Sequence, residues 1–573
     1  MNKKDVIRVL EAIATYLEIK GDNPFKISAY RKAAQALETD KRPLAELDDP
    51  ASLSGIGKGT AEVILELKQT GASKLYDELA GSLPAGLLEL LKLPGLGGKK
   101  IGKLYQELNV VDLTSLQQAC QEGKVQSLAG FGKKTEEKLL AAIEEVTTRP
   151  ERLALPVVLP VVAEIEAALE TMDGVERFSR AGSLRRLKEE VKDLDFIIAT
   201  TEPGKVRDQL LALPAVTKVI ASGETKVSVE VTATFPISID FRLIQPEAFA
   251  TTLHHFTGSK EHNVKMRQLA KKRGEKISEY GVEDAETGKV RTFASEDAFF
   301  AYFGLSYIPP EAREDQGEIE QAEATAPRRY VEEADIIADL HMHTTWSDGA
   351  HSIEEMVEAA RKRGYQYIAI TDHSRYLKVA NGLSIEQVKE QHAYIRQLNQ
   401  RYDDFTILTG IEMDILPDGT LDYPDELLAE IDFVIASIHS SFQQDQETIM
   451  QRLKNALLNE HVDMIAHPTG RLLGKREGYQ VDVEQLIELA KETNTALELN
   501  ANPLRLDLAA HWLKKAEEAG VVIAINTDAH HMKMMEDMSF GAGIARKAML
   551  DPSSVLNTWP LERLQQFLQR NRP

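Results

Sequence analysis

Seven short apolar segments, separated by helical stretches, fill the sequence after about residue 335 and restrict its fold more than any other feature. Strands that alternate with helices build a parallel sheet, because each helix returns the chain to the end where the next strand begins. We therefore predict a parallel sheet of βα units, closed into a barrel. The seven segments are residues 336–340, 367–370, 405–408, 433–436, 462–466, 496–499 and 521–525.

Side chains that bind metals follow the ends of these segments. The C-terminal ends of the strands of a βα barrel gather at one face, where catalytic groups accumulate. Nine such ligands exceed the needs of two sites, so we expect three cations. Imidazole and carboxylate ligands without a thiolate favour Mn²⁺, Zn²⁺ or Fe²⁺, which activate water and bind phosphate oxygens. The nine candidates are His341, His343, Asp348, His373, Glu412, His439, His467, Asp528 and His530.

A single histidine is more often packed or exposed than a ligand, and only the repetition at strand ends opposes that interpretation. The histidines outside the pattern are interpreted as structural or exposed: His351, His392, His461, His511 and His531. Another group either contacts substrate and supports the ligands or belongs to the ordinary surface: Asp372, Arg375, Arg471, Lys475 and Asn500.

A glycine motif occurs three times before residue 140. Its copies are Leu53-Ser-Gly-Ile-Gly-Lys-Gly59, Leu93-Pro-Gly-Leu-Gly-Gly-Lys99 and Leu128-Ala-Gly-Phe-Gly-Lys-Lys134. The glycines permit a tight turn that exposes backbone N–H groups at a helix N-terminus, where a phosphate oxygen is readily bound. The motif resembles the helix-hairpin-helix of DNA-binding proteins, which contacts phosphates without reading bases. The alternative is three ordinary glycine turns, which the recurrence and the trailing lysines disfavour. The candidate contacts are Gly55, Gly57, Gly95, Gly97, Gly130 and Gly132.

Three aspartates in the middle of the chain form a second candidate metal site. Asp193 and Asp195 are two residues apart on a predicted strand and share a face, and a neighbouring strand can bring Asp240 beside them. With two Mg²⁺ or Mn²⁺ ions such a triad activates a 3′-hydroxyl and stabilises a leaving pyrophosphate. Gly182, Ser183 and Arg186 precede the triad and would hold the triphosphate. Asp-x-Asp alone also occurs as exposed acids at a strand end.

These residues resemble the family X DNA polymerases, the polymerase beta relatives of the nucleotidyltransferase superfamily. The segment Leu253-His-His-Phe-Thr-Gly-Ser259, followed by Lys265, is similar to the family's lining of the incoming sugar and base. The resemblance implies that Gly258 lets the backbone approach the nucleotide. It also implies that Asn263 and Arg267 face the nascent pair and the template, with His255 and Phe256 beside the sugar. His254 and His255 could instead be surface histidines.

The sequence departs from the family at three places. His255 stands where the family has a Tyr that excludes ribonucleotides, and Val191-Lys192 stands where a Ser-Gly pair often precedes the first catalytic Asp. Val63 stands where some members carry a Schiff-base lysine, and that lyase step needs an amine nucleophile. We therefore expect the first domain to bind a 5′-phosphate through Lys26, Arg31 and Lys58 without the lyase activity. Those three charges could also be solvated helix residues.

The C-terminal region is similar to the polymerase-and-histidinol-phosphatase (PHP) domain, which implies a distorted (β/α)7 barrel with a trinuclear metal centre. The order of features resembles a bacterial family X polymerase over nearly the whole chain. It predicts a multidomain protein with helical hairpin domains, an α+β nucleotidyltransferase palm, a small thumb and the barrel. The expected domains are residues 1–85 (5′-phosphate side), 86–150 (fingers-like), 151–249 (palm), 250–312 (thumb), 313–334 (acidic linker) and 335–573 (barrel).

Composition restricts the setting of the protein. A single cysteine, Cys120, excludes an intramolecular disulfide and a thiolate cluster and fits the cytoplasm. No segment is long and apolar enough for a membrane span, and we expect a monomer. The net charge of −22 disfavours binding to nucleic acid, but residues 1–150 carry equal numbers of acidic and basic side chains, and most of the excess lies beyond residue 310.

The sequence thus predicts a template-directed polymerase that fills short gaps in gapped or nicked DNA from deoxynucleoside triphosphates, as in base excision repair. The barrel would add 3′–5′ exonuclease and abasic-site endonuclease activity. A phosphatase of the histidinol-phosphate type with a degenerate polymerase region is one alternative. A non-catalytic scaffold that binds DNA ends is another, and the intact carboxylate and histidine sets disfavour both.

Overall fold

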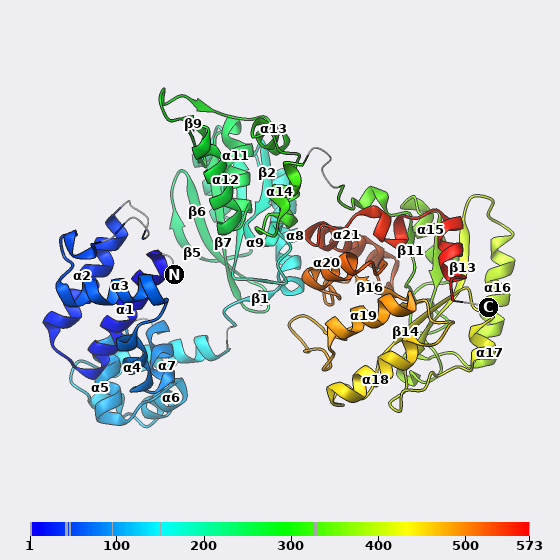
Figure 1. The fold of residues 1–573 in the computed structure, drawn as a ribbon, viewed down its shortest axis with the longest axis horizontal. Coiled ribbons are helices and arrows are strands. Elements are labelled where there is room, and N and C mark those ends of the chain that lie inside the picture. The colour runs from blue at the N-terminus through cyan, green and yellow to red at the C-terminus, as the bar shows by residue number, and fades with distance from the viewer. Residues whose placement is uncertain are drawn as a thin grey trace. The chain divides into compact units, whose positions relative to one another are not determined.

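The computed structural model describes residues 3–40, 44, 47, 49–93, 95–148, 150–324 and 329–571. The chain forms two compact units, Met1–Glu151 and Arg152–Pro573. Figure 1 shows the helical first unit in blue and the sheet-containing second unit from cyan to red. None of the described helices is both long and apolar enough to cross a membrane.

The first unit is helical and contains two apolar cores, one built from residues before 83 and the other mainly from residues after it, with Ile19 in the second core. Three of its helices begin within the three glycine motifs, each directly after Gly57, Gly97 or Gly132. Gly57 and Gly97 are the N-caps of two of them, and Gly55, Gly95 and Gly130 have the positive φ values that a tight turn requires. The helices are α1 (Lys3–Lys20), α2 (Pro24–Thr39), α3 (Lys58–Thr70), α4 (Lys74–Gly81), α5 (Gly98–Leu108), α6 (Leu113–Gln121) and α7 (Lys133–Thr148).

The palm is a five-stranded sheet with the strand order β2-β4-β7-β6-β5. Its central strands β4 and β7 run parallel, and their register places Asp195 opposite Asp240, as the sequence predicts. A two-stranded β1-β3 ribbon lies beside it. The strands are β1 (Leu153–Ala154), β2 (Arg177–Ala181), β3 (Glu190–Val191), β4 (Asp193–Ala199), β5 (Val216–Ser222), β6 (Lys226–Thr232) and β7 (Pro236–Ile244), and the helices are α8 (Leu155–Thr171), α9 (Gly182–Arg185) and α10 (Pro203–Leu211).

The thumb follows the palm and packs around the buried aromatic pair Phe299 and Phe300. Its elements are α11 (Phe249–Thr257), α12 (Lys260–Lys272), β8 (Glu275–Ser278), β9 (Gly281–Asp284), β10 (Val290–Arg291), α13 (Glu296–Tyr302) and α14 (Glu318–Ala322).

The expected acidic linker is wrong for residues 313–324. Arg313 is fully buried, and Ile319 and Ala322 of α14 belong to the thumb core. An acidic composition concealed the apolar face of this short helix, whose Glu318 is itself buried beside His262. Residues 325–328, also within the expected linker, lie outside the described residues.

The C-terminal region has the expected seven-stranded parallel sheet, in the order β11-β12-β13-β14-β15-β16-β17. A bridge between Met342 and Ala529 brings the two ends of the sheet together into a nearly closed barrel. All seven predicted segments overlap a strand. The strands are β11 (Ala338–Asp339), β12 (Tyr367–Ile370), β13 (Thr406–Asp414), β14 (Phe433–Ser437), β15 (Met464–Ile465), β16 (Ala496–Asn500) and β17 (Ile523–Asn526).

Helices cover the outside of the barrel, and one of them contacts the palm. The apolar core of the palm is continuous with that of the barrel. At Gly543 of α21 an added Cβ would lie 2.3 Å from a terminal methyl of Leu187 of the palm, so the two domains approach closely here. The barrel helices are α15 (Ile353–Lys362), α16 (Ile385–Asn399), α17 (Asp425–Leu428), α18 (Gln446–Leu457), α19 (Val483–Thr493), α20 (Ala510–Ala519), α21 (Met538–Lys547) and α22 (Leu561–Leu568).

Candidate active sites

The palm triad lies on the two central strands of its sheet. Asp193 is exposed, whereas Asp195 and Asp240 are half-buried. Burial, together with the charges of Asp193 and Asp240, raises the pKa of Asp195 to about 6. The three carboxylates therefore repel one another, and divalent cations between them would remove that repulsion.

The oxygens of Asp240 have protein partners. Ser228 donates a hydrogen bond to Oδ1 at 2.6 Å, and Nζ of Lys226 lies 2.7 Å from Oδ2. Among the described residues, every group of acids and histidines whose ligand atoms lie within 4.8 Å of one another belongs to the barrel. The three aspartates of the palm are in register on neighbouring strands, but their oxygens do not all lie within that limit of one another. Sequence reasoning missed Lys226, which faces Asp240 from the next strand.

The candidate triphosphate residues Gly182 and Ser183 lie on the short helix α9 beside the triad, and Arg186 directly follows that helix. Gly182 has φ +59°, and a Cβ there would collide with Oδ2 of Asp195, so this turn requires glycine. Arg186 donates to the carbonyl of Thr257 at 2.7 Å and pairs with Glu314 at 2.8 Å. These contacts connect α9 to the end of α11, and Ser183 in the same turn is half-buried.

The candidate sugar and base residues gather at the junction of α11 and α12. Nδ2 of Asn263 donates to the carbonyls of His255 at 2.8 Å and Gly258 at 3.2 Å, which fixes the turn between the helices. A Cβ on Gly258 would meet the side chain of Asn263 at 2.6 Å, so the glycine is needed for this packing. The ring of Phe256 lies under the guanidinium of Arg242, and Arg267 is exposed on α12.

The candidate 5′-phosphate contacts are surface residues of the first unit. Lys26 pairs with Asp22 at 3.1 Å and Arg31 with Glu18 at 2.7 Å, whereas Lys58 is exposed at the start of α3. Val63, in place of a Schiff-base lysine, is buried in the core. The role of these positions in binding DNA stays a prediction.

The barrel brings the nine candidate ligands together at the C-terminal ends of its strands. Eight of them form three overlapping groups whose ligand atoms lie within 4.8 Å of one another. The ninth, His467, lies 2.9 Å through Nε2 from Oε1 of Glu412, a member of the third group. The groups are His343, Asp348, His373 and His530; His341, His343 and Asp528; and His373, Glu412 and His439.

The electrostatics of this centre suit cations. Burial and the neighbouring His373 and His530 lower the pKa of His343 to about 3, so its ring is neutral near pH 7. Burial opposes ionisation of Glu412, but the surrounding histidines together hold its pKa well below the ordinary value. Burial opposes protonation of His341, His439 and His530, but neighbouring carboxylates outweigh it and raise the pKa of His439 to about 10, that of His530 to about 9 and that of His341 well above its ordinary value. A cation at this site would displace those protons, because imidazole binds metals in its neutral form.

Several ligand atoms have no hydrogen-bond partner among the described residues, although they are buried. They are Nε2 of His341, both ring nitrogens of His343, Nδ1 of His373 and Oε2 of Glu412. Buried polar atoms are almost always satisfied, and a bound ion is one of the ordinary explanations for exceptions. The residues present therefore fit a polynuclear metal site.

Comparison with known proteins gives three matching family models. They are the helix-hairpin-helix domain over residues 1–73, the DNA polymerase beta thumb over 252–314 and the PHP domain over 339–502. The chain is 59% identical over the full length of both chains to the DNA polymerase/3′-5′ exonuclease PolX of Bacillus subtilis (strain 168). The chain belongs to the bacterial family X DNA polymerases that carry a PHP domain.

Other relatives of this family X polymerase match only part of it. A probable phosphatase of Thermoanaerobacter sp. (strain X514) is 29% identical and aligns over 41% of this chain and 96% of its own length. A probable phosphatase of Caldanaerobacter subterraneus is 29% identical over 41% of this chain and 92% of its own. Part of the polymerase is thus similar to proteins named probable phosphatases.

Sequence reasoning missed two carboxylates that contact the candidate metal ligands of this family X polymerase. Oε1 of Glu498 lies 2.7 Å from Nδ1 of His341, and Oδ1 of Asp414 lies 3.3 Å from Nδ1 of His439. Such partners orient the ring and direct its other nitrogen towards the cation. An acid inside a wholly buried apolar strand, as Glu498 is in β16, was the signal that could have revealed it.

For one group of residues the sequence left two roles open, support of the candidate ligands or an ordinary surface position. The structure gives different contacts to different members of this group. Asp372 is buried and accepts from Thr344, and Asn500 donates to Asp528 at 3.1 Å. Arg375 instead pairs with Asp422, and Arg471 with Glu189 of the palm.

Proposed function

We propose that this polymerase fills short gaps in DNA during base excision repair and trims 3′ ends in its barrel, where it also incises abasic sites. The observation that carries the proposal is the presence, in one chain related to PolX over its full length, of two separate acid-rich centres. One lies on the palm sheet and the other at the strand ends of the barrel.

In the palm, Asp193, Asp195 and Asp240 would hold two Mg²⁺ or Mn²⁺ ions, which supply activation of the 3′-hydroxyl and charge for the leaving pyrophosphate. The backbone of Gly182, with Ser183 and Arg186, binds the triphosphate. Release of Arg186 from Glu314 would free its guanidinium for this purpose.

The thumb residues act on the sugar and base of the incoming nucleotide. His255, with Phe256 beside it, faces the sugar in place of the family's tyrosine. Asn263 fixes the turn that ends at Gly258, and Arg267 contacts the template side. We infer that ribonucleotides are excluded through the imidazole and the fixed backbone.

In the barrel, the nine candidate ligands would hold three Mn²⁺, Zn²⁺ or Fe²⁺ ions, which supply an activated water and charge for the scissile phosphate. Glu498 accepts the Nδ1 proton of His341 and so leaves Nε2 facing the centre. His343 stays neutral through burial and its histidine neighbours. These residues prepare the site before substrate arrives.

The three glycine motifs would bind the phosphates of gapped or nicked DNA. Lys26, Arg31 and Lys58 would hold the 5′-phosphate, and the buried Val63 leaves the first unit without the Schiff-base lyase step. We further infer a monomer that acts in the cytoplasm on DNA and deoxynucleoside triphosphates.

A gapped duplex with a labelled primer tests the proposal. The chain should extend the primer with nucleotides present and shorten it without them, in Mg²⁺ and again in Mn²⁺. Asp240→Asn should lower extension at least about a hundredfold, because it removes a shared ligand, and should leave shortening intact. His439→Asn should do the reverse. Loss of both activities in either variant would contradict the assignment of two sites.

The relatives named probable phosphatases favour a second candidate, a monoesterase activity of the barrel. The same preparations should therefore be given a small phosphomonoester. Release of phosphate without any shortening of DNA would replace the exonuclease proposal by the phosphatase one. Salt-sensitive DNA binding without any turnover would instead indicate a scaffold.

A further inference from the structure

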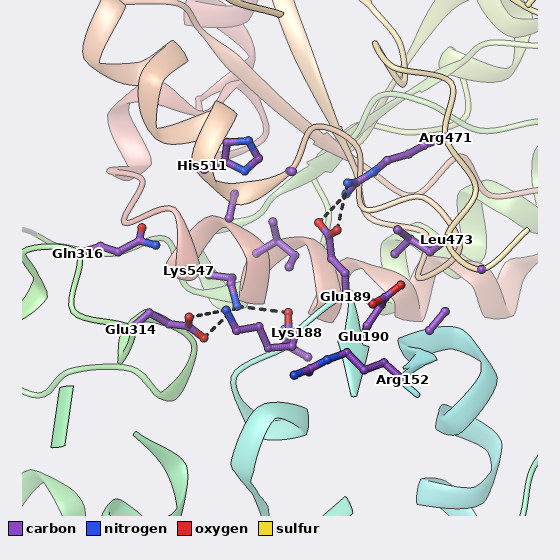
Figure 2. A pocket seen from close by; sticks show the side chains of 16 residues that line it. Arg152, Lys188, Glu189, Glu190, Glu314, Gln316, Arg471, Leu473, His511 and Lys547 are labelled. Carbon is purple, nitrogen blue, oxygen red and sulfur yellow. Dashed lines mark hydrogen bonds and ion pairs between the residues drawn. The ribbon is translucent and has the colours of Figure 1, made fainter. Parts of the chain in front are cut away.

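A cavity of about 580 Å³ lies between the palm and the barrel within the second unit. Figure 2 shows its lining, with the palm residues Lys188, Glu189 and Glu190 facing Arg471 and Lys547 of the barrel. Charges of both signs line it and pair with one another, so the cavity does not have the uniform charge of an anion site. Its paired charges instead connect the two domains.

The most direct of these connections joins Glu189 to Arg471. The carboxylate of Glu189 accepts two hydrogen bonds from the guanidinium, at 2.8 and 3.1 Å (Figure 2). Paired hydrogen bonds of this kind fix the orientation of both planar groups. The Glu189 side chain is 37% exposed, so the pair adds little to stability. Its geometric effect is the more important one.

Arg471 lies on the loop that follows His467. Its side chain forms hydrogen bonds to the loop that follows strand β16. Its Nε donates to the carbonyl of Arg505 at 3.0 Å, and its Nη2 donates to the carbonyl of Leu506. Two further bonds join the loops, because Oδ2 of Asp507 accepts from the backbone N–H groups of residues 469 and 470.

The second loop has a conformation that needs such support. Leu506 has φ +43°, in the left-handed region that a leucine rarely adopts. Backbone in this region persists only where surrounding contacts hold it. Arg471 donates hydrogen bonds to the carbonyl of Leu506 and to the carbonyl of the preceding residue, Arg505. These two hydrogen bonds hold the strained backbone in place.

The same loop carries Arg505 to the metal centre. Nε of Arg505 lies 3.2 Å from Oδ2 of Asp528. The other oxygen of Asp528 lies 3.2 Å from Nε2 of His343. The guanidinium of Arg505 thus pairs with Oδ2 of Asp528, and Oδ1 of this candidate ligand is left to bind a cation.

We propose that Glu189 of the palm is a positioning residue for the reaction of the barrel. Through Arg471 it fixes the loop of Leu506, and through that loop it fixes Arg505 against Asp528. The inference rests on the proposed nuclease function and adds that the barrel depends on a residue of the palm. Glu189 contacts neither substrate nor metal itself.

The test compares Glu189→Ala with Glu190→Ala in the full chain. Glu190 is the next residue, lines the same cavity and has the same charge, so it is a matched control. We expect Glu189→Ala to lower kcat for shortening of single-stranded DNA about tenfold, with KM within twofold, as loss of a ligand-supporting contact does. Mn²⁺ affinity of the barrel, measured by titration, should weaken by a similar factor. Gap filling should stay within twofold in both variants, which shows that the chain is folded.

A double variant tests the route. If Glu189 acts through Arg471, adding Glu189→Ala to Arg471→Ala should cause no further loss of kcat or Mn²⁺ affinity. Independent, multiplying losses would overturn the proposal, as would equal behaviour of the two glutamate variants. A wild-type chain that does not shorten DNA would refute the nuclease function, whereas the Mn²⁺ titrations would still test the contact of Glu189.

Discussion

Glu296 in helix α13 is the residue whose replacement should destabilise the thumb most. Its carboxylate, 7% exposed, is held between two arginines. Arg185 of α9 donates to both oxygens, at 2.7 and 3.1 Å, and the fully buried Arg313 pairs with Oε1. Glu296→Gln keeps the shape of the side chain but leaves two cations facing each other without an anion.

The magnitude follows from the burial of the partners. Removing one member of a buried ion pair costs about 3–5 kcal/mol, because the remaining charge is left uncompensated. We expect about 3 kcal/mol, since the amide can still accept one hydrogen bond. At roughly 1.4 kcal/mol per factor of ten, the amides of α13 should exchange with solvent about a hundredfold faster.

Hydrogen exchange measured on peptides is the appropriate assay, because it reads each region separately. The three tryptophans, Trp346, Trp512 and Trp559, all lie in the barrel and would not report on the thumb. Peptides from the barrel should keep their wild-type rates. Asp297→Asn is the control, because Asp297 is the neighbouring acid and is exposed.

The pH dependence gives a second reading. Burial alone would raise the pKa of Glu296, but the charges of Arg313 and Arg185 outweigh it and hold this pKa well below the ordinary value. A carboxylate with a depressed folded pKa contributes stability above its unfolded pKa and loses it as pH falls through the folded one. The difference between variant and wild type should therefore be the same at pH 5 and pH 8. Exchange within threefold of the control at both values would refute the reasoning.

Three further changes have expected outcomes. Gly182→Ala should lower primer extension by at least about tenfold and leave shortening intact, because the new Cβ collides with Asp195; an assay of both activities checks it, and unchanged extension would contradict it. Burial and the adjacent Glu536 raise the pKa of Asp537 to about 7. The folded state therefore loses stability as the pH rises from about 4 to 7, because the buried carboxyl must ionise. Asp537→Asn should raise the thermal midpoint at pH 8 but leave it unchanged at pH 4. Mn²⁺ at a hundredfold excess over its Kd should raise the stability of the barrel by about 2.7 kcal/mol per site, read as a shift of the tryptophan-fluorescence melt that EDTA reverses; no shift would argue against a metal centre.

The sequence predicted most of the fold because the signals are local. Each of the seven apolar segments after residue 335 overlaps a strand, and the candidate ligands lie near the ends of those strands or in the loops that follow them, with Glu412 inside β13. In a parallel barrel this position alone brings them to one face. The same holds for the palm, where a spacing of two residues and parallel pairing place Asp195 opposite Asp240.

Composition was a poorer guide than periodicity. The acidic stretch after residue 312 reads as a linker, yet it contributes Arg313 and Ile319 to the buried thumb. The structure explains why, since the acids there face cations, such as Arg186 opposite Glu314. A charged residue is compatible with a packed segment when its partner is supplied from elsewhere in the chain.

The sequence by itself therefore determined the order of the matched domains, the strands of the barrel and the set of candidate residues for holding cations. Only the tertiary structure decided how those residues are supported and how the domains are joined. Glu189 and Arg471 are 282 residues apart, and Arg185 and Glu296 are 111 apart. Pairings at such separations leave no periodic signal in one sequence, because they arise from the packing of whole elements rather than from the geometry of a strand or a turn.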